Sequence, residues 1–95
     1  MNYIILDLEW NQPFNMKMMV KEPVMLSGEI IQIGAVRVTE DQVVTDEFQI
    51  MIRPKYYRHL NRRVSKLTGI KETQLREEGV PFPEAIEAFR NWCGE

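Results

Sequence analysis

The sequence lacks the features on which several large classes of protein depend. It has one cysteine, Cys93, so it can form neither an intramolecular disulfide nor a cysteine-rich zinc site. No apolar run approaches the roughly 20 residues that a membrane-spanning helix needs. The N-terminus also lacks the basic region and long apolar core that direct secretion. Together these absences predict a protein of a reducing, cytoplasmic compartment.

The composition is that of an ordinary small globular protein. At 95 residues the chain is one small domain or part of a larger one. Its hydrophobic content of 44% and charged content of 27% are typical of soluble proteins. The sequence shows no internal repeat and no low-complexity tract. Its net charge of -2 is small, but the charges are unevenly distributed along the chain.

The first chemical feature is a pair of acids that directly follows an apolar run. Tyr3–Leu6 predicts a short strand buried on both faces, and Asp7 and Glu9 follow at its carboxyl end, separated by Leu8. Because strand side chains alternate, both carboxylates point the same way, with Cα atoms ~7 Å apart. At an effective dielectric of about 20 they repel each other by ~2 kcal/mol. The pair therefore predicts a Mg²⁺ or Mn²⁺ site, and the alternative is two solvated acids that lead into a turn.

Two alternating segments further along predict an antiparallel hairpin. Residues 29–39 and 43–53 alternate apolar and polar side chains, and the polar residues 40–42 join them. Gly34, within the first segment, predicts a bulge or a close backbone approach. The methionine-rich stretch 14–26 fits neither the helical nor the strand period and predicts a long, partly mobile loop. It serves either as a connector that covers the core or as a flexible lip over a substrate groove.

A strongly basic segment follows the hairpin. The residues from Arg53 to Lys71 include seven of the chain's 12 basic residues and none of its 14 acidic ones. Tyr56, Tyr57 and His59 lie among them, and His59 is expected at the surface rather than as a general base. Basic residues interleaved with aromatic ones are typical of surfaces that grip a phosphodiester backbone and stack on bases. The alternative is a solvated face that balances acids elsewhere in the fold.

Local signals predict the helices. Asn61 is suited to cap the start of a short helix and Gly69 to end it. Residues 71–78 predict a further helical turn, and 79–81 break the chain. A longer helix then begins near Pro83. Its apolar residues recur at helical spacing and predict one stripe facing the core: Phe82, Ile86, Phe89 and Cys93.

Taken in order, these motifs resemble one family of enzymes. DLEW after an apolar strand, EIIQIGAV, FQIMIRP, and LTGI followed by KETQL are similar to the N-terminal half of DnaQ-like (DEDD, DEDDh-type) 3′–5′ exonucleases. The similarity is greatest to exoribonucleases of the Eri and histone-mRNA type and to their sporulation-inhibitor relatives. It implies an α/β, RNase H-like fold that opens with a three-stranded antiparallel meander. Residues 1–95 would be the N-terminal part of a single exonuclease domain.

The resemblance also implies an activity and a set of site residues. The activity is hydrolysis of terminal phosphodiesters with two Mg²⁺ or Mn²⁺ ions, on single-stranded nucleic acid, with RNA favoured. Asp7 would bridge both ions, and Glu9 would bind the ion that positions the attacking water. The remaining residues that the resemblance assigns to nucleic-acid binding are Leu8, Trp10, Asn11, Arg62, Arg63, Leu67, Thr68 and Gly69.

The sequence departs from the family pattern in one respect. The family needs two further aspartates and a histidine general base from later motifs, which Asp41, Asp46 and His59 do not match. We therefore expect this chain to be inactive alone. The alternative function is a catalytically silent nucleic-acid-binding or regulatory module on the same scaffold. Without the later parallel strands, Tyr3–Leu6 would present a bare apolar edge, which predicts self-association or strand exchange.

Overall fold

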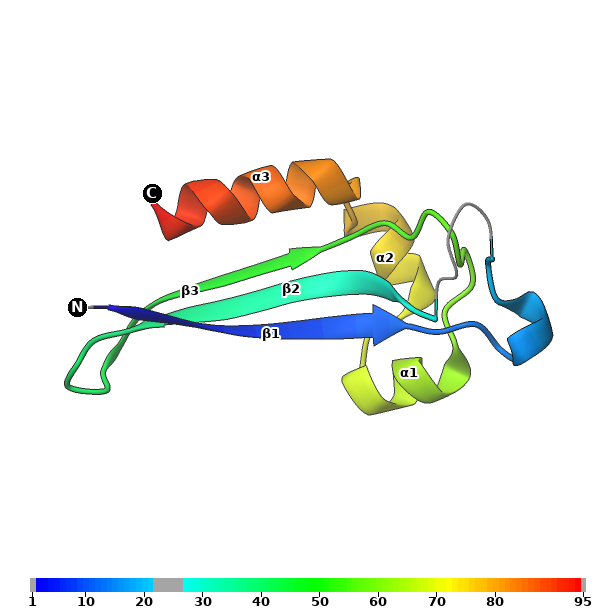
Figure 1. Cartoon of the computed structure of the whole chain (residues 1–95), viewed down its shortest axis with the longest axis horizontal. Helices are drawn as coiled ribbons and strands as arrows, with labels where there is room; N and C mark the ends of the chain where they lie inside the picture. The colour runs from blue at the N-terminus through cyan, green and yellow to red at the C-terminus, as the bar shows by residue number, and fades with distance from the viewer. Residues whose placement is uncertain (1, 22–26, 95) are drawn as a thin grey trace.

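A three-stranded antiparallel sheet forms the centre of the computed structural model, which describes residues 2–21 and 27–94. The strands lie in the order β1 (Tyr3–Asn11), β2 (Glu29–Val38), β3 (Val44–Met51). Figure 1 shows α3 (Phe82–Cys93) along one face of the sheet. The shorter elements lie toward the end of the sheet where β1 finishes: the 3-10 helix η1 (Met16–Met18), α1 (Arg62–Thr68) and α2 (Glu72–Glu78). The predicted α/β class and three-stranded meander are confirmed.

Strand β1 is longer than predicted and lies at an edge of the sheet. All nine of its residues pair with β2, and no strand of the described part lies on its other side. The expected burial on both faces is wrong for this chain, because the side chains of Tyr3–Leu6 are between 38% and 58% exposed. The bare apolar edge expected for this segment is present.

Strands β2 and β3 form the predicted hairpin, but Gly34 does not play the predicted part in it. The shifts of register fall elsewhere, between Glu9 and Trp10 and between Arg37 and Val38. A Cβ added at Gly34 would lie 3.7 Å from the nearest backbone oxygen, which is an ordinary contact distance. Gly34 therefore marks neither a bulge nor a close backbone approach.

The first of these register shifts divides the core into two clusters. Ile31 and Ile33 are two residues apart and would share a face in a regular strand. The partners of the adjacent residues Glu9 and Trp10 are Gln32 and Ile30, so the shift leaves one extra residue of β2, Ile31, between them. As a result Ile33 packs under α3 with Ile52 and Ala85, whereas Ile31 packs beside α1 and α2 with Leu60, Val64, Ile70 and Leu75.

The helices α1 and α3 follow their sequence signals closely. Asn61 caps α1, since its side-chain oxygen accepts a hydrogen bond from the N–H of Arg63 at 2.9 Å, and Gly69 ends it with φ 77°. In α3, which begins one residue before Pro83, Ala85 is fully buried. Phe82, which was expected in the core stripe, is instead 45% exposed. No helix in the described ranges is long and apolar enough to cross a bilayer.

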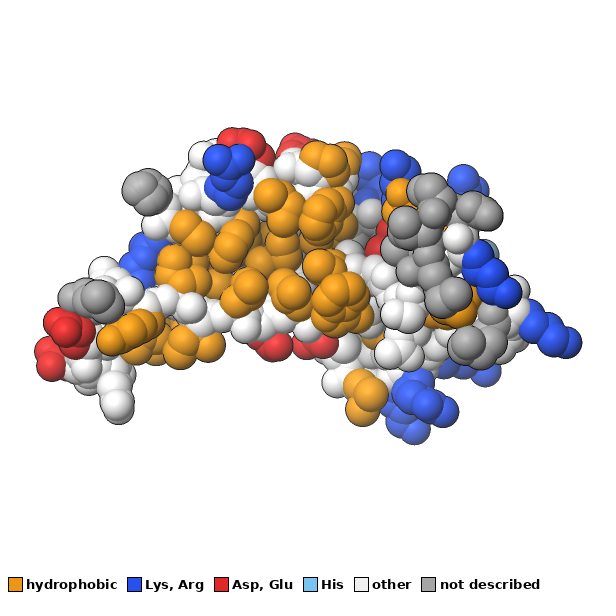
Figure 2. All heavy atoms as spheres, viewed as in Figure 1, with side chains coloured by type: hydrophobic (Ala, Val, Ile, Leu, Met, Phe, Trp, Pro, Cys, Tyr) orange, Lys and Arg blue, Asp and Glu red, His pale blue; other side chains and the backbone are white. Residues whose placement is uncertain are grey.

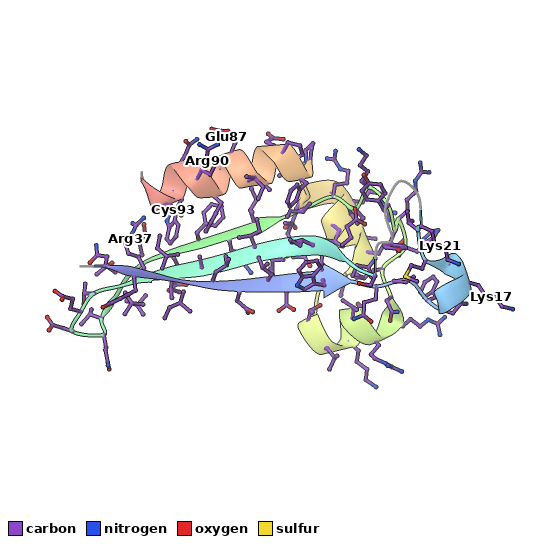
Figure 3. All side chains as sticks on the ribbon, viewed as in Figure 1. Lys17, Lys21, Arg37, Glu87, Arg90 and Cys93 are labelled. Atoms are coloured by element: carbon purple, nitrogen blue, oxygen red, sulfur yellow. The ribbon has the colours of Figure 1, made fainter. Side chains whose placement is uncertain are left out.

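The C-terminal half of α3 is fixed to the sheet by an aromatic and charged cluster. Trp92 lies with its ring 5.5 Å from that of Phe48, and its indole N–H donates to Asp46 at 3.0 Å. The Arg37 guanidinium lies 4.5 Å over the Trp92 ring and pairs with Asp46 at 3.2 Å. Figure 3 shows Arg37 below this end of α3, while Glu87 and Arg90 project from the opposite side of the helix.

Candidate functional site

Asp7 and Glu9 share the face of β1 that is turned away from α3. Leu8, between them, packs against the cluster under α3, so strand alternation directs both carboxylates to the other face. Asp7 lies in a shallow depression of ≈ 520 Å³ whose lining also includes Glu47 and Gln49 of β3. Both acids lie within β1 rather than at its end as predicted, because the strand continues to Asn11.

The two carboxylates have no protein partner within residues 2–21 and 27–94, where neither makes a hydrogen bond or an ion pair. Carboxylate oxygens that are not neutralised by a neighbouring cation are suitable ligands for a hard divalent ion such as Mg²⁺ or Mn²⁺. In that same part of the chain no group of three or more His, Cys, Asp or Glu side chains could hold a metal. Asp7 and Glu9 could therefore supply two of the ligands of a divalent ion.

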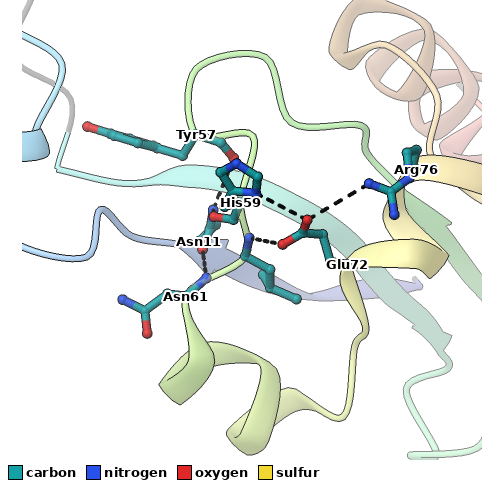
Figure 4. A network of polar contacts seen from close by, with 7 residues as sticks. Asn11, Tyr57, His59, Asn61, Glu72 and Arg76 are labelled. Atoms are coloured by element: carbon teal, nitrogen blue, oxygen red, sulfur yellow. Dashed lines mark hydrogen bonds and ion pairs between the residues drawn. The ribbon is translucent and has the colours of Figure 1, made fainter.

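The end of β1 is fixed by Asn11, whose side chain is completely buried. Its amide nitrogen donates to the carbonyl oxygens of Tyr57 at 3.3 Å and His59 at 3.1 Å, and its oxygen accepts from the N–H of Asn61 at 2.9 Å (Figure 4). These three hydrogen bonds give Asn11 a positioning role, because they set the course of the chain into α1. The contact with a nucleotide that the resemblance implies for Asn11 stays a prediction.

The same segment is held from its other side by Glu72. One of its carboxylate oxygens accepts the N–H of Leu60 at 2.9 Å, and the other lies 3.2 Å from Nδ1 of His59 and 3.8 Å from Arg76 (Figure 4). The Leu60 N–H, followed by His59, holds the pKa of Glu72 below its ordinary value of 4.5. The His59 side chain is 75% exposed, in agreement with its expected surface position.

Glu29 is a positioning residue that the sequence analysis missed. One carboxylate oxygen accepts the backbone N–H groups of Lys55 at 2.6 Å and Tyr56 at 3.0 Å, and the other accepts the N–H of Tyr57 at 2.9 Å. Three consecutive N–H groups directed at one carboxylate form an anion-binding turn. Glu29 thereby fixes the start of the basic segment. Its one sequence signal was its position as the first residue of an apolar strand.

The basic segment continues into α1, which lies against β1. Arg62, Arg63 and Leu67 project from this helix, and Leu67 is 80% exposed, which is unusual for a large apolar side chain. Thr68 instead bonds within the helix end, where its hydroxyl donates to the Val64 carbonyl oxygen at 2.9 Å. Figure 2 shows basic side chains gathered over the end of the molecule that holds η1 and α1; Lys17 and Lys21 also project there (Figure 3).

The residues assigned to nucleic-acid binding thus fall into separate groups. Leu8 is half-buried and packs against the core cluster under α3, and its expected contact with a nucleotide stays a prediction. Trp10 is 47% exposed and lines a different hollow from the one that holds Asp7. Gly69 forms the left-handed turn that ends α1.

Comparison of the sequence with known proteins finds similarity to an exonuclease family and to individual relatives. A family model described as Exonuclease, RNase_T, matches residues 4–95. The human protein named ERI1 exoribonuclease 2 is 36% identical over 67 residues, which cover 70% of this chain and 10% of that protein. The PolC-type DNA polymerase III of Thermotoga petrophila is 42% identical over 50 residues, which cover 53% of this chain and 3% of that protein.

Solved structures share the fold. The nuclease domain of 3′hExo, a DEDDh family member bound to rAMP, superposes with a TM-score of 0.76 at 23% identity, covering 96% of this chain and 42% of that one. Cell-death related nuclease 4 gives a TM-score of 0.75 at 21% identity, covering 97% of this chain and 29% of that one. The chain therefore has part of the RNase H-like fold of 3′-exonucleases, and it spans less than half the length of these neighbours.

Proposed function

Because this chain belongs to the RNase_T exonuclease family, we propose that it forms part of a metal-dependent 3′–5′ exonuclease that acts on single-stranded RNA. The observation that carries the proposal is the pair of unpartnered carboxylates, Asp7 and Glu9, on the open face of β1. RNA is favoured because one matching relative is named an exoribonuclease and a structural neighbour is described as recognising the 3′ end of a histone mRNA stem-loop.

In this proposal Asp7 and Glu9 hold the divalent ions. Mg²⁺ or Mn²⁺, when bound, supplies activation of a water molecule and neutralises charge on the leaving oxygen. Arg62 and Arg63, exposed at the start of α1, track the phosphates of the bound strand. Leu67 offers an exposed apolar surface for the terminal sugar or base. Asn11 and Glu72 support these groups by fixing the segment that leads into α1.

Residues 1–95 are proposed to be the N-terminal part of one exonuclease domain. They supply two carboxylate ligands, and the described part of the chain offers no cluster of three. The chain also covers 42% of a solved nuclease domain with the same fold. In this proposal the other ligands and the general base are not among the described residues, so the 95-residue chain is expected to show no nuclease activity alone.

The test replaces Asp7 and uses Glu47, a second carboxylate beside the same depression, as its matched control. Asp7→Asn is expected to remove the heat of Mn²⁺ binding from calorimetric titrations of the chain. In the protein encoded by the longest reading frame that contains the chain, Asp7→Asn should lower the release of nucleoside monophosphate by more than about 100-fold. Loss of a residue that only supports a metal ligand already lowers metal affinity or activity by about 10–100-fold. Glu47→Gln should change neither. An Asp7→Asn protein that keeps both signals would refute the assignment.

A catalytically silent nucleic-acid-binding or regulatory module is the second candidate function. It is favoured by one observation, that the described residues offer only a pair of carboxylates where a metal cluster would need more. Assays of the same longer protein distinguish the two functions. Tight binding of labelled single-stranded RNA in Mn²⁺, with no nucleoside monophosphate released, would establish the silent module; release of the product establishes the enzyme.

A further inference from the structure

A second and larger hollow lies beside the end of β1. It has a volume of ≈ 780 Å³ and is formed by the end of β1, the start of β2, residues 52–58 and the first turn of α3. Ile30 and Ile52, which line it, belong to the core cluster under α3. The hollow therefore opens on the α3 side of the sheet, whereas Asp7 and Glu9 lie on the other side. Figure 2 shows hydrophobic side chains gathered on this side, between α3 and β1.

Three aromatic rings surround this hollow and none of them is buried. Trp10 is 47% exposed, and Tyr56 and Phe82 are each 45% exposed. They come from three separate elements, which are β1, the basic segment and the start of α3. Exposed apolar residues are ordinary when scattered, but several aromatic side chains around one hollow are typical of a binding site.

The rim of the hollow is positively charged. Lys55 and Arg58 line it and are exposed, and the Lys55 ammonium lies 5.4 Å from the centre of the Tyr56 ring. Glu29 is the one acidic residue among the described residues of the lining. Its two oxygens already accept the three N–H groups of Lys55, Tyr56 and Tyr57, so its charge is offset by those dipoles. The surface is therefore suited to an anionic ligand with flat rings.

We propose that this hollow binds unpaired nucleotides of a single-stranded nucleic acid. The bases stack on Trp10 and Tyr56 while the phosphates meet Lys55 and Arg58. This proposal rests on the proposed function, because the strand is the substrate of the nuclease, and it assigns Trp10 to nucleotides remote from the Asp7 face. An uncharged apolar peptide would fill the hollow but would leave the two cations without partners, so a nucleic acid fits the surface better.

The experiment measures RNA affinity in EDTA, where no metal contributes. The probe is a fluorescein-labelled oligoadenylate of about ten nucleotides, a length within the site sizes of single-strand binders, and anisotropy reports binding to the 95-residue chain. Trp10→Ala and Tyr56→Ala should each weaken binding between about 5-fold and about 100-fold, as expected for the loss of one base stack. Trp10→Phe keeps a ring and should retain most of the affinity.

Two matched controls separate stacking and charge from general effects. Tyr3→Ala removes an aromatic side chain that is 53% exposed at the opposite end of β1, and it should leave the affinity unchanged. Lys55→Gln should weaken binding and reduce its salt dependence, whereas Arg90→Gln, on the side of α3 that faces away from the sheet (Figure 3), should not.

Each contrary outcome has a definite meaning. Unchanged affinity in both Trp10→Ala and Tyr56→Ala would overturn the proposal. If these variants also lost self-association, the hollow would be a protein-docking surface instead. Failure of the proposed function is detected separately, as an unchanged Mn²⁺ heat in Asp7→Asn, because the EDTA assay does not depend on that carboxylate.

Discussion

Glu72 holds two consecutive residues of the basic segment, since one of its oxygens accepts the Leu60 N–H at 2.9 Å and the other lies 3.2 Å from Nδ1 of His59. Asn11 holds the same segment from the side of β1 through the carbonyl oxygen of His59 and the N–H of Asn61. The chain between β3 and α1 is therefore clamped by two side chains that come from different elements. This clamp sets the position of the exposed basic residues at the start of α1.

The first prediction concerns the pH dependence of this clamp. The pKa of Glu72 is lowered in the folded protein, so the ionised carboxylate stabilises the fold above its ordinary pKa of 4.5. That contribution is lost as the pH falls through the lowered folded pKa. Glu72→Gln should therefore lower the free energy of unfolding by about 1 kcal/mol or less near neutral pH, because the side chain is partly exposed. In acid it should lower the free energy of unfolding by almost nothing.

Urea unfolding of both proteins between about pH 7 and about pH 3 measures the effect. Glu77→Gln, an exposed acid on the same helix, serves as the control and should change stability little at any pH. A stability difference between wild type and Glu72→Gln that stays constant across the whole range would contradict the prediction.

The second prediction concerns Glu29. Glu29→Gln keeps the size of the side chain but leaves one acceptor oxygen and no charge for three N–H groups. Because hydrogen bonds to charged groups contribute ~1.5–3 kcal/mol, the free energy of unfolding should fall by about 2 kcal/mol. Amide exchange at Lys55, Tyr56 and Tyr57 should accelerate. Glu87→Gln, which projects from α3 away from the sheet (Figure 3), should leave both measurements unchanged; protected amides in Glu29→Gln would disprove the role.

The parts of the fold that were predictable are those specified by local chemistry. The caps of α1 at Asn61 and Gly69 and the start of α3 near Pro83 depend on single residues and their neighbours, and all were confirmed. The separation of Ile31 from Ile33 was not predictable, because a pattern of period two does not reveal a register shift against another strand.

The same distinction applies to the candidate site. Asp7 and Glu9 could be selected because they are two residues apart on one strand. Asn11 and Glu29 could not be interpreted, because their partners are backbone groups 26 to 50 residues further along the chain. Phe82 has the helical spacing of a core residue, yet it stays exposed because the first turn of α3 borders the larger hollow.

The third prediction concerns the free edge of β1. An exposed apolar edge with unpaired backbone groups promotes pairing with another chain, so the 95-residue chain is expected to self-associate. Ile5, 58% exposed on this strand, is the position to test. Ile5→Lys should shift the mass measured by light scattering toward the monomer across micromolar concentrations. Leu67→Lys, a change at a more exposed apolar residue of α1, should not, and a strictly monomeric wild type would refute the prediction.

The fourth prediction compares two glycines that are required for different reasons. Gly79 has an ordinary φ of -70°, but a Cβ there would lie 2.3 Å from the Leu75 carbonyl oxygen and 2.7 Å from the Arg53 backbone nitrogen. Both neighbours are backbone atoms that are fixed by hydrogen bonds, Leu75 to Gly79 itself and Arg53 to Val80. Gly79→Ala should therefore force α2 away from the end of β3 and cost about 3 kcal/mol or more.

Gly69 provides the matched control, because its φ is 77° and nothing lies within 4 Å of an added Cβ. Gly69→Ala carries only the conformational cost of the left-handed region, about 1 kcal/mol, and thermal unfolding should rank it well above Gly79→Ala in stability. Equal midpoints would contradict the steric argument.

The effect of Gly79→Ala should also extend to the larger hollow, because the Arg53 side chain that lines the hollow donates to the Gly79 carbonyl oxygen at 2.8 Å. Gly79→Ala should therefore also weaken oligoadenylate binding in EDTA.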